Sequence, residues 1–86
     1  MNTELNNNGS TEFLNFSEAL NYLRWGDRVA RRGWNDKNMH IAVQYPDQNS
    51  KMGRPYIYMV PVDSVPIPWV ASQADILAED WYALSE

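Results

Sequence analysis

Two short segments carry the side chains that could bind a ligand. The first, RRGWNDKNM at 31–39, combines cations, an indole and an amide: Arg31, Arg32, Trp34, Asn35 and Lys37. Cations neutralise phosphate, an indole stacks on a base, and an amide hydrogen-bonds the edge of a base or sugar. This segment predicts a site for a nucleotide-like ligand, although solvated surface charges are an equally good interpretation of each cation taken alone.

The second segment, PWVASQADILAEDW at 68–81, has a tryptophan near each end and a polar stretch between them. Ser72 and Asp75 have the spacing of a capping box at a helix start. Such a start offers backbone N–H groups to an anion, but both side chains compete for those groups. The segment therefore favours ribose hydroxyls as ligands, with Trp69 as a second stacking surface.

Candidates for catalysis are few. The chain has no cysteine, which excludes a thiolate nucleophile and disulfides. His40 lies in a strand pattern, and Ser72 is better explained as a cap than as a nucleophile. Asp75, Glu79 and Asp80 could suggest a metal site, but without a histidine nearby a solvated helix face is the better interpretation. No phosphate-binding glycine motif is present, so we expect a non-enzymatic protein with no cofactor and no metal.

Composition indicates one small domain. The 86 residues are 44% hydrophobic and 21% charged, which is ordinary for a globular chain. The sequence has no apolar run of the roughly 18 residues that a membrane span needs and no secretory signal. We therefore expect a cytoplasmic protein with no membrane partner. Residues 1–13, which are rich in Asn, Ser and Thr, predict a disordered tail before a single domain at 14–86.

The charge pattern and the aromatic content limit the classes of binding partner that fit this sequence. All seven cationic residues lie between Arg24 and Arg54, together with three acidic residues, so this window has a net charge of +4. The remaining eight acidic residues give the rest of the chain a net charge of −8. Such an acidic chain is a poor candidate for binding duplex nucleic acid. Four Trp, five Tyr and two Phe exceed what so small a core readily buries, which favours subunit contacts, a ligand, or both.

Sequence periodicity predicts an α+β fold with a small, mainly antiparallel sheet. The first helix runs from an N-cap at Asn15, with Glu18 completing a capping box, to Gly26. Tyr22 and Trp25 lie off its apolar stripe, on a face that we expect to meet another subunit. Strands are predicted at 29–32, 39–45 and 56–62, with Pro61 placing the end of the last one at a sheet edge or a bulge.

The rest of the chain completes the order helix-strand-strand-strand-helix-strand. Residues 46–55 form a hairpin loop and residues 63–68 an extended connection. A second helix starts after Ser72, and the spacing of Ala74, Leu77, Ala78 and Trp81 places Trp81 in the core at its end. A short last strand follows at 81–84. Trp69 lies on no periodic face, which leaves it available for a ligand.

Taken together, the segments at 16–39, PYIYM at 55–59 and the segment at 68–81 resemble the second type of phage Thoeris anti-defence protein. GWN-x-K-x-M and PW-x-ASQ-x-D-x-LA-x-DW are specific in combination. The match covers nearly all of residues 16–82, and Trp25 departs from the family pattern. The resemblance implies a sponge that sequesters cyclic ADP-ribose isomers, made by bacterial TIR-domain sensors, without cleaving them.

The resemblance also implies a homotetramer with ligand pockets shared between protomers, acting in the host bacterial cytoplasm. Carried onto this chain, one pocket wall comprises Trp34, Asn35, Lys37 and Met39. The other comprises Trp69, Ala71, Ser72, Gln73 and Asp75. An indole would stack on adenine, polar side chains would bind ribose, and Lys37, Arg31 or Arg54 would neutralise the pyrophosphate.

Three alternatives remain open at this point. Some relatives in the family hold cyclic dinucleotides, so the ligand could be of that class. The chain could instead be an oligomeric protein-interaction module that uses the face of Tyr22 and Trp25. A nucleotide hydrolase is the third alternative, and it differs from a sponge in releasing products instead of intact ligand.

Overall fold

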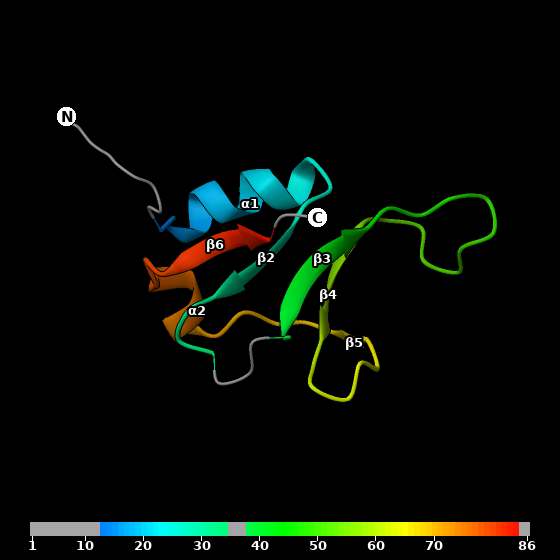
Figure 1. Cartoon of the computed structure of the whole chain (residues 1–86). Coiled ribbons are helices and arrows are strands. Elements are labelled where there is room, and N and C mark those ends of the chain that lie inside the picture. The colour runs from blue at the N-terminus through cyan, green and yellow to red at the C-terminus, as the bar shows by residue number, and fades with distance from the viewer. Residues whose placement is uncertain (1–12, 35–37, 85–86) are drawn as a thin grey trace.

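The computed structural model describes residues 13–34 and 38–84. Its strands form a five-stranded antiparallel sheet with the order β5-β4-β3-β2-β6 (Figure 1). The predicted α+β class is confirmed. Along the chain the elements are α1 Phe16–Arg24, β2 Arg28–Arg31, β3 His40–Gln44, β4 Tyr56–Val60, β5 Ile67–Pro68, α2 Gln73–Leu77 and β6 Trp81–Leu84.

Helix α1 begins and ends where its sequence predicts. Asn15 is the N-cap: its side chain accepts from the Glu18 N–H at 2.8 Å, and the Glu18 carboxylate accepts from the Asn15 N–H at 2.9 Å. Gly26 follows the C-cap with φ +97°, a conformation that glycine adopts without strain. Both ends are therefore fixed by contacts within a few residues.

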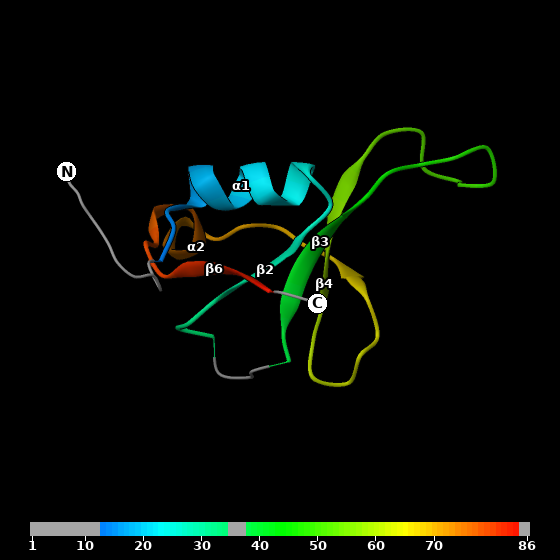
Figure 2. The same ribbon diagram turned by 45° about the horizontal axis from the view of Figure 1, so that its top comes forward.

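The core lies between α1 and one face of the sheet (Figure 2). Ala19 and Leu23 from the helix meet Val29 from β2, Ile41 from β3 and Trp81 from β6, and all five are fully buried. Trp81 is the largest of these side chains. The predicted burial of Trp81 is confirmed.

The predicted reason for that burial is wrong. Helix α2 ends at Leu77, because Ala78 has an extended ψ of 151°. Trp81 therefore enters the core from β6, where it pairs with Arg31 of β2. Leu77, which the helical spacing placed inward, is 77% exposed. Pairing with β2 overrides the helical pattern after Ala78.

The sheet also differs from expectation at its edge. Ile67–Pro68, expected to be an unpaired connection, form the edge strand β5 against β4. Strand β4 is consequently internal and ends one residue before Pro61. Ala42 of β3 is buried and pairs with Tyr58 of β4.

The second face of α1 is only partly separate from the core. Tyr22, expected to lie apart from it, packs against the core cluster. Trp25 contacts Tyr22 edge-to-face at 5.2 Å between ring centroids and is 71% exposed. The expectation for Tyr22 needs correction, because its side chain packs against the buried core cluster. Subunit contact through Trp25 stays a prediction.

Candidate functional site

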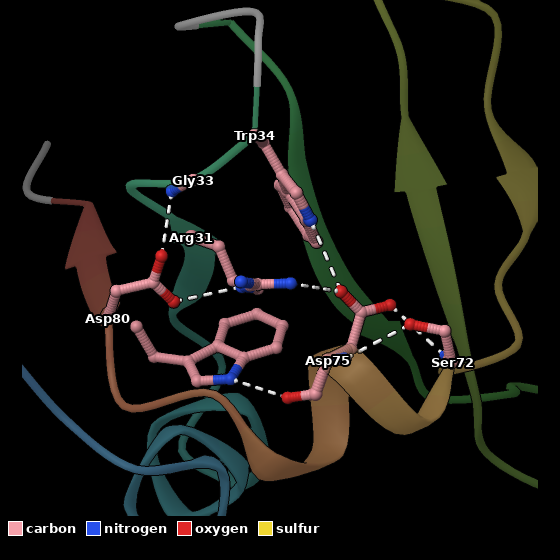
Figure 3. Close-up of polar contacts among 7 residues, drawn as sticks. Arg31, Gly33, Trp34, Ser72, Asp75 and Asp80 are labelled. Atoms are coloured by element: carbon pink, nitrogen blue, oxygen red, sulfur yellow. Dashed lines mark hydrogen bonds and ion pairs between the residues drawn. The ribbon is translucent and has the colours of Figure 1, made fainter.

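Arg31 joins the two segments that the sequence singled out. It lies at the end of β2, and its Nε donates to Asp80 Oδ1 at 2.8 Å while its Nη1 donates to Asp75 Oδ1 at 2.9 Å (Figure 3). The Gly33 N–H donates to the other Asp80 oxygen at 2.8 Å. A Cβ at Gly33 would lie 2.9 Å from that oxygen, so glycine permits the carboxylate to come this close.

Asp75 is the centre of the cluster. It is only 8% exposed. Its Oδ1 accepts from Arg31 and from the Trp34 indole Nε1–H, the latter at 3.3 Å, and its Oδ2 accepts from the Ser72 N–H at 3.1 Å. The Asp75 N–H donates back to Ser72 Oγ at 3.0 Å, which confirms the predicted capping box.

Two half-buried tryptophans flank the buried Trp81. The Trp34 ring lies edge-to-face on Trp81 at 5.3 Å between centroids, and the Trp69 ring lies edge-to-face on it at 6.2 Å. Such geometry is typical of favourable aromatic pairs. Trp69, which its sequence position left available, thus contacts the core, and also Phe16 at 6.2 Å. Trp34 and Trp69, the two predicted stacking residues, therefore contact the same buried ring, Trp81, within a single chain.

The ion pairs determine the protonation of the cluster. Burial raises the pKa of Asp75, but hydrogen bonds from Arg31, Ser72 and Trp34 outweigh burial and lower the pKa below its ordinary value. Asp80 behaves similarly, with its pKa lowered by Arg31 and by the Gly33 N–H against the effect of burial. The hydrogen bond to Asp80 raises the pKa of Arg31. All three groups are therefore charged at neutral pH.

The cluster is poorly suited to bind an anion. Two carboxylates and one guanidinium leave a net charge of −1, which repels phosphate. The capping box already uses two N–H groups at the start of α2, and the helix has only five residues. Within residues 13–34 and 38–84, no three acidic or histidine side chains gather as a metal site would require.

Four predicted site residues meet at this cluster: Arg31, Trp34, Ser72 and Asp75. Trp69 contacts Trp81, which Trp34 also contacts. Gln73 is exposed at the start of α2, Ala71 is half-buried before it, and Met39 is half-buried just before β3. Asn35 and Lys37 lie outside the described residues. Arg54 lies in the loop after β3, which extends away from α2 (Figure 1).

One sequence interpretation needs correction. Asp75 and Asp80 do not form a solvated helix face, because both pair with Arg31. Arg31 lies between the two carboxylates, and its contact with pyrophosphate stays a prediction. Sequence reasoning gave Gly33 no role in the site and placed Asp80 on a solvated face. The Asp80 side chain instead connects β2 and the following turn to the start of β6. No local spacing indicates a contact between residues 49 positions apart.

Comparison with known proteins agrees with the resemblance. A family model described as the Thoeris anti-defense 2-like domain matches residues 14–84. A relative named Thoeris anti-defense 2, from Bacillus phage SP01, is 34% identical in an alignment that covers 84% of this chain and 96% of the relative. Because the family match includes both segments of the site and every element of the fold, the chain belongs to the Thoeris anti-defense 2-like family.

Proposed function

We propose that this protein counters Thoeris immunity as a phage sponge, binding cyclic ADP-ribose isomers such as glycocyclic ADP-ribose without cleaving them. Membership of the anti-defense family supports the anti-Thoeris role. The observation that carries the ligand class is the convergence of two indoles and a polar cluster around Trp81. In this proposal the protein acts in the cytoplasm of the infected cell. In the described parts of the chain, no helix is long and apolar enough to cross a bilayer.

The indoles of Trp34 and Trp69 provide ring surfaces for the adenine base. Stacking is worth about 1–3 kcal/mol per base in single-strand nucleic-acid complexes. Ser72 and Gln73 at the start of α2, with Asn35, would bind ribose hydroxyls. A sponge needs an affinity near the nanomolar range, about −12 kcal/mol, because it must hold a scarce messenger stoichiometrically.

The pyrophosphate must lie away from the Asp75–Arg31–Asp80 cluster, since that cluster is net negative. Lys37 and Arg54 are the cations we propose for it. Arg54 is carried by the loop that extends from the far end of β3 and β4 (Figure 1), so a neighbouring protomer of a homotetramer would have to deliver it. The exposed Trp25 supports such assembly.

Recovery of the ligand tests the proposal directly. The protein is incubated with a cyclic ADP-ribose isomer, separated from free ligand and denatured by heat, and the released compound is identified by mass spectrometry. A sponge returns intact ligand in stoichiometric amount. Cleaved products would identify a hydrolase, and ligand that is never depleted would refute binding. A parallel panel of cyclic dinucleotides tests the other ligand class.

A protein-interaction module is the second candidate, because one observation favours it. A groove between α1 and the β3–β4 hairpin is lined mainly by apolar and aromatic side chains: Leu20, Arg24, Val43, Tyr45, Pro55, Tyr56 and Ile57. Exposed aromatic side chains are enriched at protein interfaces. Such a module would bind a protein partner and leave every cyclic nucleotide in solution.

A further inference from the structure

Asp75 stands at the junction of the two proposed ligand-binding segments. It belongs to α2, yet its carboxylate accepts hydrogen bonds from Arg31 at the end of β2 and from Trp34 three residues beyond (Figure 3). We propose that Asp75 is a positioning residue, which fixes the Trp34 indole for ligand contact and does not itself bind the ligand. This inference rests on the proposed function.

The acceptor sites of Asp75 are largely used inside the chain. A carboxylate offers about four lone-pair sites. Arg31 and Trp34 occupy both sites of Oδ1, and the Ser72 N–H occupies one site of Oδ2. The residue is also 8% exposed, so a ribose hydroxyl has little access to it. The predicted ribose contact of Asp75 is therefore replaced by a role within the protein.

The same geometry fixes what Trp34 offers to a ligand. An indole has one donor, Nε1–H, and Trp34 directs it at Asp75. The ring also lies edge-to-face on Trp81, with 78° between the ring planes. A hydrogen bond at one edge and a ring contact together restrict rotation of the side chain. What remains for a ligand is the ring surface, which suits a planar base.

A purely structural role for Asp75 makes a different prediction. Asp75 also caps α2, so its loss could weaken capture simply by loosening that helix. Two residues separate the roles. Ser72→Ala removes the capping hydroxyl but leaves both contacts of Asp75 Oδ1. Trp81 is an internal reference, because its Nε1–H donates to the Asp75 backbone carbonyl at 3.0 Å, a contact that side-chain substitutions leave in place.

Indole N–H signals of the full ¹⁵N-labelled chain provide the test without any ligand. Trp34→Phe assigns the Trp34 signal, and Trp81→Phe assigns that of Trp81. In Asp75→Ala we expect the Trp34 signal to shift and its solvent exchange to accelerate about tenfold or more, while the Trp81 N–H, still bonded to the backbone carbonyl, keeps its slow exchange. Ser72→Ala should leave the Trp34 signal in place. An unchanged Trp34 signal in Asp75→Ala would overturn the proposal.

The conservative variant links positioning to capture. Asp75→Asn retains an oxygen that accepts from Trp34, so we expect it to restore most of the Trp34 signal. In calorimetric titration with a cyclic ADP-ribose isomer, Asp75→Ala should weaken binding about tenfold or more, and Asp75→Asn should restore most of it. If Asp75→Asn restores the signal yet binds as weakly as Asp75→Ala, the carboxylate contacts the ligand and positioning is refuted.

Two further outcomes stay decisive. If the wild-type chain binds no cyclic nucleotide, the proposed function fails, and the indole spectrum still decides whether Asp75 holds Trp34. If Asp75→Ala does not fold, Asp75→Glu replaces it, because glutamate is the usual residue at this position of a capping box. Its longer side chain should displace the Trp34 signal while α2 persists, and an undisplaced signal would contradict positioning.

Discussion

At the scale of single residues, Trp81 supports both the fold and the site. It is fully buried, contacts Phe16, Trp34 and Trp69, and donates to the Asp75 carbonyl. We expect Trp81→Ala to lower the free energy of unfolding by about 3–5 kcal/mol, which is most of the stability of a small domain. Chemical denaturation followed by circular dichroism measures this.

A matched control uses the exposed tryptophan. Trp25→Ala removes the same side chain from a position that is 71% exposed. Measured at low protein concentration, where assembly contributes little, its effect on the free energy of unfolding should stay within about 0.5 kcal/mol. A Trp81→Ala variant as stable as Trp25→Ala would refute the assignment of Trp81 as the central core residue.

Asp75 and Asp80 make the free energy of unfolding depend on pH in the acid range. Folding lowers the pKa of Asp75 and Asp80, so the unfolded chain binds more protons than the folded chain as the pH falls. Their contribution is complete above the ordinary aspartate pKa of 3.8, and it is lost as the pH falls through the lower folded values.

Denaturation midpoints measured from pH 7 down to pH 2 test this dependence. We expect the wild-type midpoint to fall in the acid range, and we expect Asp80→Asn to be less stable at pH 7 but flatter below pH 4. Asp63→Asn, which alters an exposed carboxylate outside the cluster, is the control and should follow the wild-type curve. An Asp80→Asn curve parallel to wild type would contradict the ion-pair assignment.

At the scale of elements, α2 depends on its cap because it has only five residues. So short a helix has little stability of its own. We expect Ser72→Ala to cost about 1 kcal/mol of unfolding free energy and to accelerate amide hydrogen exchange mainly in α2. Ser17→Ala, on the exposed side of α1, should change neither quantity appreciably. Equal exchange in α2 with and without Ser72 would show that tertiary contacts alone hold the helix.

The elements that the sequence predicts well are those determined by neighbouring residues. Both capping boxes depend on side chains three positions apart, and their spacing is visible in the sequence. The length of α2 and the strand β5 depend instead on pairing with distant partners, Arg31 for Trp81 and Met59 for Ile67. Propensity and periodicity do not encode such pairing, so the helical interpretation of 74–81 was wrong after Leu77.

The site shows the same division. The two segments are recognisable from residue types alone, since three of the four tryptophans lie in them beside polar side chains. Their contact is not, because Arg31 reaches Asp75 and Asp80 across 44 and 49 positions. Sequence reasoning predicted contacts of Arg31 with a phosphate and of Asp75 with a ribose, and it did not predict that the two side chains pair with each other.

At the scale of the whole molecule, capture and assembly should respond to different tryptophans. Trp69→Phe keeps a ring next to Trp81 but reduces the stacking surface at the start of α2. Trp25 is distant from Trp69 along the chain. It caps the C-terminal end of α1, whereas Phe16, which contacts Trp69, lies at the start of that helix. If the exposed indole forms a subunit contact, Trp25→Ala should lower the molar mass measured by light scattering.

Calorimetric titration and light scattering on both variants separate the two roles. We expect Trp69→Phe to weaken binding of a cyclic ADP-ribose isomer about tenfold, the loss of roughly 1.4 kcal/mol of stacking, with the molar mass unchanged. Trp25→Ala should reduce the molar mass, and it should weaken binding only if a neighbouring protomer completes the pocket. Retention of wild-type affinity by a monomeric Trp25→Ala variant would place the whole site within one chain, and then Arg54, on its distant loop, could not neutralise the pyrophosphate.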